Sequence, residues 1–97
     1  MLESTVERRF VDLVKKRWPT AICLKLAALG RRGMPDRLVL LPGGVVAFVE
    51  LKRPGGEATT LQVHVHGLLR ALGFKVGVFD DAKEAVLWVA SQDHISG

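Results

Sequence analysis

The amino-acid sequence predicts a single α/β domain with a mixed central sheet flanked by helices, in the element order αβββαβα. Three features indicate this fold: a helical apolar pattern near the N-terminus, two branched-aliphatic segments joined by a Pro-Gly-Gly turn, and a helix, strand and helix after them. The hairpin implies antiparallel pairing, and the later crossover helix implies a parallel pair. We expect residues 1–97 to form one domain, because a chain this short has room for one limited core.

The N-terminal segment is expected to form a helix and then a short strand. Apolar residues recur at helical spacing from a start near Ser4, and Pro19 stops the pattern, so a helix is predicted over residues 4–17. Residues 21–26 are mostly apolar and form the first strand candidate. The glycines and the proline of residues 30–35 then mark a loop.

A β-hairpin is predicted in the middle of the chain. Residues 36–41 and 45–52 are both rich in branched aliphatic side chains. Pro42-Gly43-Gly44 separates them, which is typical of a hairpin turn. The Arg-Pro-Gly-Gly sequence of residues 53–56 ends the second of these strands.

The last part of the chain is expected to contain a helix, a strand and a final helix. Thr59 or Thr60 is suited to cap a helix that ends near Gly73. Residues 74–79 form the fourth strand candidate. A helix is predicted over residues 81–91, because its first residue is an N-cap acid with a glutamate three positions on.

The composition is that of a folded domain with a modest basic excess. Apolar residues make up 48% of the chain and charged residues 25%, which argues against disorder. The net charge of +4 favours an anionic partner, with nucleic acid as the first candidate. A solvated basic surface without any nucleic-acid role remains open from charge alone.

The sequence also favours a reducing, cytoplasmic setting. Cys23 is the sole cysteine, so an internal disulfide is excluded, and its apolar neighbours favour a buried thiol. No apolar run approaches the roughly 20 residues of a membrane span, so we expect no membrane association. The acidic start lacks the basic and apolar regions of a signal peptide, so we expect the mature protein to be the whole chain.

Two acids and a lysine are expected to converge at the end of the hairpin. If Leu41 pairs with Val45 across the turn, the register sets Asp36 directly opposite Glu50. Lys52 lies two residues after Glu50, so both side chains leave the same face of the strand. Opposed carboxylates destabilise a strand pair and raise each other's pKa unless a cation lies between them.

This arrangement is suited to a divalent metal site. Hard oxygen ligands suit Mg²⁺ or Mn²⁺, which orient a phosphate and lower the pKa of an attacking water. Lys52 would then position that water or stabilise charge developing on the phosphate. The alternative is an ordinary surface ion pair, which contributes at most about 1 kcal/mol. The apolar strand before Glu50 and the opposing Asp36 favour the catalytic interpretation.

Four features occur in one order over almost the whole chain: a helix with glutamate, Gly33-Met34-Pro35-Asp36, Glu50-Leu51-Lys52 and Gln62. In these features the sequence resembles the virus-type replication-repair nucleases (VRR-NUC), a branch of the PD-(D/E)XK superfamily. Each motif is short, and the order, spacing and strand context make them specific together. The resemblance implies a restriction-endonuclease-like core.

The resemblance also implies an activity and a ligand set. It implies DNA phosphodiester hydrolysis with Mg²⁺ or Mn²⁺ held by Asp36, Glu50 and the main-chain carbonyl of Leu51. Lys52 would assist the nucleophile, and Gln62 would lie beside the catalytic centre. Some small members look like homodimeric nucleases of four-way (Holliday) junctions in DNA repair, and a phage-encoded protein acting in a host cell fits this pattern.

The family's helix-one glutamate falls on either Glu3 or Glu7. We prefer Glu7 as a catalytic residue and metal ligand, because it lies one turn before Phe10 on the inward edge of the helix. The alternative places Glu7 in a capping box that Ser4 opens, in which case it bonds only to the helix start.

Basic residues near the predicted site are candidates for phosphate contact. Arg31, Arg32 and Gly33 belong to the loop before Asp36, and Arg53 follows the catalytic strand. Guanidinium groups and flexible backbone there would bind phosphates without reading base sequence. A solvated basic loop is the alternative interpretation.

Other residues give weaker signals. His64 and His66 lie two apart on the predicted helix, so they point in different directions and are expected to be surface or partly buried residues. The run Ala85–Ala90 is apolar all round a helix, so one face is expected on the sheet and the other on a second subunit. A twofold dimer would match the symmetry of a four-way junction.

Two other functional classes remain open. The same fold could serve as a non-catalytic nucleic-acid-binding or assembly subunit, although a pure binder gains nothing from carboxylates that face phosphate. A protein-interaction domain that uses the apolar last helix is the second alternative.

Overall fold

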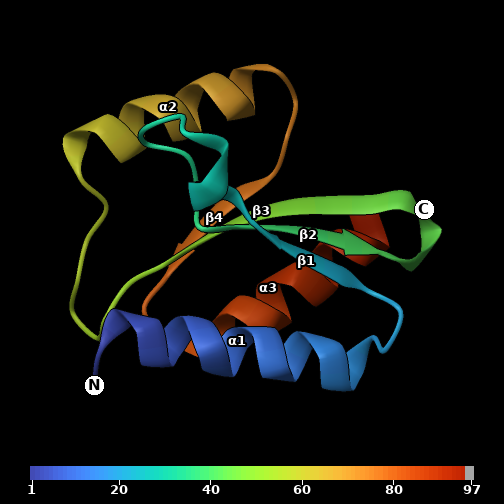
Figure 1. The fold of residues 1–97 in the computed structure, drawn as a ribbon. Coiled ribbons are helices and arrows are strands. Elements are labelled where there is room, and N and C mark those ends of the chain that lie inside the picture. The colour runs from blue at the N-terminus through green and yellow to red at the C-terminus, as the bar shows by residue number, and fades with distance from the viewer. Residues whose placement is uncertain (96–97) are drawn as a thin grey trace.

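A computed structural model describes residues 1–95 and shows helices on both faces of a four-stranded sheet (Figure 1). The order αβββαβα predicted from the sequence is confirmed. The elements in chain order are α1 (Glu3–Arg17), β1 (Ile22–Lys25), β2 (Arg37–Leu41), β3 (Val45–Leu51), α2 (Thr60–Ala71), β4 (Val76–Phe79) and α3 (Ala82–Ile95).

The sheet is mixed, as the strand order predicts. Its strands lie in the order β1-β2-β3-β4, with antiparallel pairing of β1 with β2 and of β2 with β3, and parallel pairing of β3 with β4. Leu41 pairs with Val45 and Arg37 with Val49. The predicted hairpin register is therefore confirmed as far as the pair of Arg37 with Val49, the residues next to Asp36 and Glu50.

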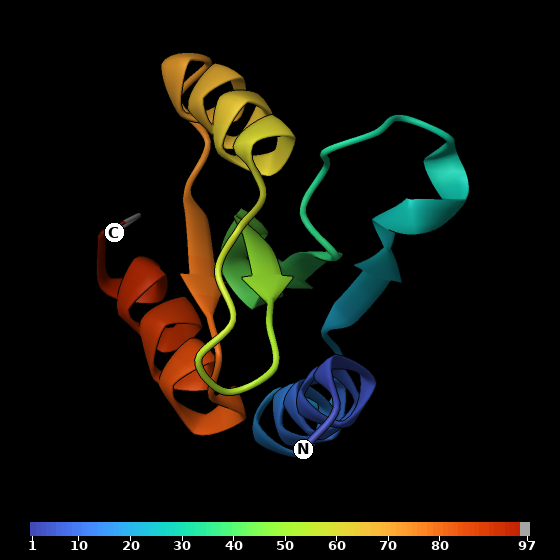
Figure 2. The same cartoon turned by 90° about the vertical axis from the view of Figure 1, so that its left-hand side faces the viewer.

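Helices cover the two faces of the sheet unequally (Figure 2). Helices α1 and α3 lie side by side on one face, and α2 lies on the other. The larger core, under α1 and α3, includes Phe10 and Val14 of α1 together with alternate residues of β3 such as Val49. The smaller core lies beneath α2 and is centred on Phe48 and Val76. Period-two alternation along β3 thus sends every second residue, Glu50 included, to the α2 face.

Helix starts follow the sequence expectation at α2 and depart from it at α1. The Thr59 side chain accepts a hydrogen bond from the Gln62 N–H, and the Gln62 side chain accepts one from the Thr59 N–H, which is a complete capping box. At α1 the N-cap is Leu2, so Ser4 lies inside the first turn, and the alternative in which Ser4 and Glu7 form a capping box is wrong. One consequence is that Glu3, not Glu7, occupies the first turn of the helix.

Strand ends and the last helix differ in length from the prediction. β1 ends at Lys25 because the chain turns into a short 3-10 helix, Leu26–Leu29. The Phe74 N–H donates to the Leu69 carbonyl at the end of α2, so β4 begins two residues later than expected. α3 continues past Ser91 to Ile95.

The apolar helix α3 is covered on one side and open at one prominent position. Ala85, Val86 and Val89 are buried against the core, whereas Leu87 is 63% exposed. Neither α3 nor any other helix within residues 1–95 is long and apolar enough to cross a membrane.

Gly33 fixes the loop that delivers Asp36 to the sheet. Its φ of +83° favours glycine, and a β-carbon there would lie 2.7 Å from Val65 Cγ2 and 3.0 Å from Leu61 Cγ of α2. The loop therefore packs directly on α2, and only a residue without a side chain permits this approach.

We expect Gly33→Ala to lower the free energy of unfolding, measured by urea denaturation, more than Gly30→Ala does. Both residues have positive φ, so both substitutions add backbone strain of roughly 1–2 kcal/mol. A β-carbon added at Gly33 also clashes with α2, and such overpacking costs about 1–3 kcal/mol more. A β-carbon added at Gly30 has nothing within 4 Å, so this second cost is missing there. Equal losses for the two variants would contradict tight packing of the loop on α2.

Candidate active site

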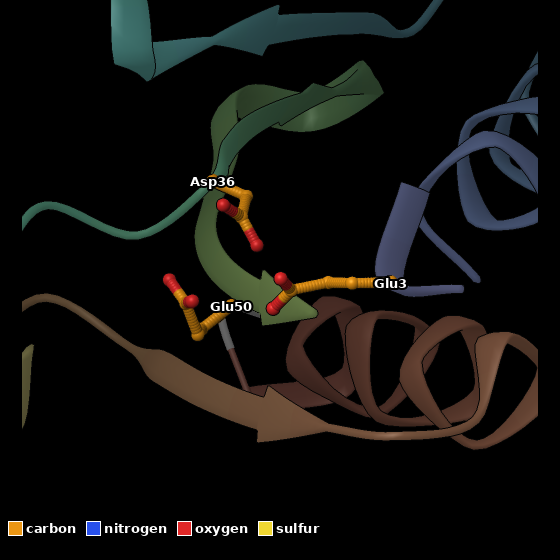
Figure 3. Close-up of side chains that lie close together, drawn as sticks. All are labelled: Glu3, Asp36 and Glu50. Carbon is orange, nitrogen blue, oxygen red and sulfur yellow. The ribbon is translucent and has the colours of Figure 1, made fainter. Parts of the chain in front are cut away.

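Three carboxylates converge at one end of the sheet, where β2 begins and β3 ends. Glu3 comes from the first turn of α1, Asp36 from the residue before β2, and Glu50 from β3 (Figure 3). One oxygen of each carboxylate lies within 4.8 Å of the others. Local register brings Asp36 to Glu50, and the docking of α1 beneath the sheet adds Glu3.

Burial and hydrogen bonds hold the two sheet acids in place. Glu50 is 1% exposed on the α2 face of β3. Asp36 is half-buried, and its Oδ2 accepts a hydrogen bond of 2.8 Å from the Leu51 N–H. This bond ties the start of β2 to the end of β3 beyond the last regular pair, so the two carboxylates cannot separate without loss of a hydrogen bond.

Lys52 neutralises part of this negative charge. Its Nζ lies 3.1 Å from Glu50 Oε2 and 3.4 Å from Glu3 Oε1. The expectation that Lys52 leaves the strand on the same side as Glu50 thus agrees with the geometry. The ammonium group bridges an acid of the sheet and an acid of α1.

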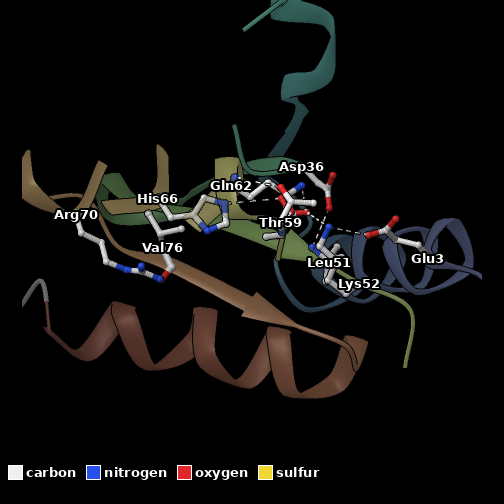
Figure 4. Close-up of polar contacts among 10 residues, drawn as sticks. Glu3, Asp36, Leu51, Lys52, Thr59, Gln62, His66, Arg70 and Val76 are labelled. Carbon is white, nitrogen blue, oxygen red and sulfur yellow. Dashed lines mark hydrogen bonds and ion pairs between the residues drawn. The ribbon is translucent and has the colours of Figure 1, made fainter. Parts of the chain in front are cut away.

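Gln62 contacts the site and caps α2 at the same time (Figure 4). Its Nε2 donates to Glu50 Oε2 at 3.0 Å, while its Oε1 accepts from the Thr59 N–H at 2.8 Å. The position of Gln62 beside the acids agrees with the expectation from the sequence. Since both ends of the amide are bonded, its orientation relative to Glu50 is fixed.

The electrostatic environment raises the pKa of both sheet acids. Burial and then the charge of Asp36 raise the pKa of Glu50 to about 7. Burial also raises the pKa of Asp36, against the hydrogen bond from Leu51. Burial works to lower the pKa of Lys52, but its contacts with Glu50 and Glu3 outweigh burial and raise it. The lysine is therefore an ammonium group at neutral pH.

The structure places Glu3, and not Glu7, in the carboxylate cluster. Glu7 Oε2 instead accepts a hydrogen bond of 2.7 Å from Arg37 Nε in a part-buried ion pair. The structure therefore favours Glu3 over the preferred Glu7 as the helix-one acid of the cluster, and the identity of the metal-binding acid stays a prediction. Glu3 and Glu7 share one face of α1, but the Glu7 carboxylate is engaged in its ion pair with Arg37 of β2.

The basic candidates lie on the two loops that adjoin the acids in sequence. Arg31, Arg32 and Arg53 are exposed, and Gly33 is half-buried against α2. One loop leads into Asp36 and the other follows Lys52. Arg31 lines a hollow with Leu68 and Leu72 near the end of α2, so its place in the sequence does not by itself bring it to the acids. The packing of Gly33 gives it a structural role.

His66 is the site residue that sequence reasoning missed. It was expected on the surface or partly buried, but its side chain is 1% exposed, and His66 Nε2 lies 4.0 Å from Glu50 Oε1. Burial, followed by the charges of Arg70 and Lys52, lowers the pKa of His66. The available signal was its spacing of four residues from Gln62, which puts both side chains on one helical face. His64 is exposed, as expected.

The donor set of this site fits a divalent cation. Three converging carboxylates, two of them with raised pKa values, offer hard oxygen ligands of the kind that Mg²⁺, Mn²⁺ and Ca²⁺ prefer. A cation there would relieve the repulsion that burial imposes on Asp36 and Glu50. The site lies at an accessible end of the sheet, because Glu3 retains 48% of its side-chain exposure.

No protein-family model matches the chain. The chain is 45% identical over 78 residues to a protein named "Putative nuclease p44" from Acyrthosiphon pisum secondary endosymbiont phage 1, over 80% of this chain and 82% of that protein. A solved structure described as a VRR_NUC domain aligns with a TM-score of 0.73 at 31% identity, over 91% of this chain and 94% of that one. These matches confirm the resemblance seen in the motifs, and the chain belongs to the VRR-NUC family of nucleases.

Proposed function

We propose that the protein is a DNA endonuclease that hydrolyses phosphodiester bonds with Mg²⁺ or Mn²⁺. The observation that supports this most directly is the convergence of Glu3, Asp36 and Glu50 next to the Lys52 ammonium group. A site with three acids and one lysine provides both cation ligands and a positive group for phosphate. Membership of a nuclease family gives the reaction class.

Asp36 and Glu50 would hold the cation, together with Glu3 and the main-chain carbonyl of Leu51. A bound divalent cation lowers the pKa of a coordinated water and polarises the scissile phosphate. The Leu51 N–H already bonds to Asp36, which holds the Leu51 backbone beside this acid. Glu7 retains a supporting role in this proposal, because its pair with Arg37 connects α1 to β2.

Lys52 would act as a charged hydrogen-bond donor and not as a base. Its contacts with two carboxylates keep it protonated, so it donates to the attacking oxygen or to a phosphate oxygen. Gln62 would hold Glu50 in place through its amide. Water would attack phosphorus and lose a proton to the solvent, the bond to the leaving sugar oxygen would break, and that oxygen would take up a proton from a solvent water.

The proposed substrate is branched DNA, with a four-way junction as the leading candidate and a homodimer as the active form. The net charge of +4 and the exposed Arg31, Arg32 and Arg53 support binding to a phosphate backbone. The exposed Leu87 of α3 borders an apolar hollow that Leu13 and Val86 also line, which supports self-association. A cytoplasmic location in a phage-infected cell remains a prediction.

The first test is cleavage of end-labelled four-way junction, flapped, duplex and single-stranded DNA with Mg²⁺, Mn²⁺ or EDTA. We expect metal-dependent cutting, strongest on the junction, that Asp36→Asn, Glu50→Gln and Lys52→Ala each reduce by at least about 100-fold, since removal of one transition-state contact costs that much. DNA binding, measured in Ca²⁺, should survive the Lys52 substitution.

Matched controls for this test are Glu57→Gln and Lys75→Ala, which change exposed residues of the same types. Both should cut at the wild-type rate. Light scattering of the protein with and without junction DNA measures the stoichiometry. DNA binding without cutting in either metal would instead favour the non-catalytic binding subunit.

The assignment of the helix-one acid is tested by Mn²⁺ titration calorimetry of Glu3→Gln and Glu7→Gln without DNA. We expect Glu3→Gln to weaken binding by about tenfold or more, because it removes a ligand oxygen from the cluster. Glu7→Gln should keep near wild-type affinity and lose at most about 1 kcal/mol of stability with the Arg37 pair. The opposite ranking would restore Glu7 as the metal-binding acid.

The contribution of the arginine loop is tested by the salt dependence of DNA affinity. Replacing Arg31 and Arg32 by alanine should weaken junction binding and reduce the slope of log K against log salt by up to about 1.8, which is roughly 0.9 for each lost phosphate contact. Alanine at the exposed Arg8 and Arg9 of α1 removes the same charge from another surface. An equal change of slope in both double variants would show a general charge effect and not a local interface.

A further inference from the structure

His66 and Glu50 form a buried pair, and the contact between them has no role in the mechanism proposed above. Both side chains are 1% exposed, and His66 Nε2 lies 4.0 Å from Glu50 Oε1. Neither atom has a hydrogen-bond partner among the residues that the structure describes. An unpaired buried polar atom costs about 1–3 kcal/mol, so two such atoms facing each other call for an explanation.

The two oxygens of Glu50 have very different surroundings. Oε2 accepts from Gln62 Nε2 at 3.0 Å and lies 3.1 Å from Lys52 Nζ, which it shares with Glu3. Oε1 has no hydrogen-bond partner among the described residues and lies 4.0 Å from Nε2 of His66, which α2 contributes (Figure 4). One oxygen is therefore held by Gln62 and Lys52, and the other lies beside His66.

We propose that His66 is a positioning residue whose Nε2–H donates a hydrogen bond to Glu50 Oε1 and thereby fixes the rotation of the carboxylate. This inference rests on the proposed function, since the rotation matters only if Oε2 serves as a ligand for the cation. A neutral imidazole has one donor and one acceptor nitrogen, so it holds the carboxylate without placing a second positive charge against the cation. Closing the 4.0 Å gap to hydrogen-bond length needs a shift of only about 1 Å.

The geometry of α2 supports this role. Gln62 and His66 are one helical turn apart on the inward face, and each is directed at a different oxygen of the same carboxylate. The Thr59 capping box fixes the start of this helix, and the Arg70 side chain donates to the Val76 carbonyl of β4 near its end. Both ends of α2 are thus anchored, so the imidazole has a defined position above the sheet.

The test compares Mn²⁺ affinity, measured by calorimetry without DNA, for wild type, His66→Leu, His66→Gln and His64→Leu. Outer-shell partners of metal ligands typically contribute 10–100-fold in affinity, so His66→Leu should weaken binding by at least about tenfold. Glutamine places an amide donor near the position of the imidazole Nε2, so His66→Gln should recover most of the affinity. His64→Leu changes an exposed residue of the same helix and should bind as wild type does.

Each of the following three results would overturn the proposal. Wild-type affinity in His66→Leu would show that Glu50 needs no such donor, and equally weak binding in His66→Gln would show that only the shape of the ring matters. Nitrogen coupling in the Mn²⁺ electron spin-echo spectrum would make His66 a direct ligand and would also overturn it. If the wild type binds no Mn²⁺ at all, both the metal-dependent function and this inference fail. If the wild type binds Mn²⁺ and a result above is obtained, only the inference fails.

A second measurement does not depend on the folding of any variant. Long-range ¹H–¹⁵N correlation spectra of the wild-type imidazole, recorded with Mg²⁺, report which ring nitrogen carries the proton. We expect the proton of His66 on Nε2. A spectrum with the proton on Nδ1 would leave Nε2 as an acceptor facing a carboxylate and would overturn the proposal.

Discussion

The pairing of β2 with β3 is the constraint on which the rest of the site depends. The turn at Pro42–Gly44 sets the register, and the register brings Asp36 and Glu50 to the same end of the sheet. The bond from the Leu51 N–H to Asp36 extends this pairing by one further step. A shift of one residue would turn Glu50 into the larger core, so the hydrophobic alternation of β3 protects the position of the acid.

Helices α1 and α2 change, in opposite directions, the electrostatic repulsion that the register creates between Asp36 and Glu50. Burial of Glu50 next to Asp36 disfavours a second negative charge. Lys52, the residue after β3, offsets it, and α2 contributes the Gln62 amide. α1 works in the other direction, because Glu3 adds another carboxylate. The net result is a cluster that is poorly balanced without a cation, a property of binding sites and not of structural ion pairs.

The parts of the site that local rules determine could be predicted from the sequence. Strand period and turn length bring Asp36, Glu50 and Lys52 together, and the cap at Thr59 places Gln62 at the start of α2. The choice between Glu3 and Glu7 could not be made in this way. The two are four residues apart on one helical face, so periodicity treats them alike.

Contacts between distant elements decided the remaining assignments. Arg37 takes the Glu7 carboxylate only because α1 docks beside β2. His66 is buried because α2 lies across Glu50; its spacing of four residues from Gln62 indicates a shared helical face but not the burial of that face. The contact of Gly33 with α2 is also a contact between distant elements. The sequence indicated a flexible loop there, whereas packing on α2 holds the loop in place.

Lys52 lies between Glu50 and Glu3, so its ammonium group contacts the same carboxylates that a cation would bind. Under the proposed function, an arriving cation would compete with this ammonium group for the two carboxylates. An Nζ displaced in this way would be left to contact the phosphate of a substrate, so cation binding and the availability of the lysine would be coupled.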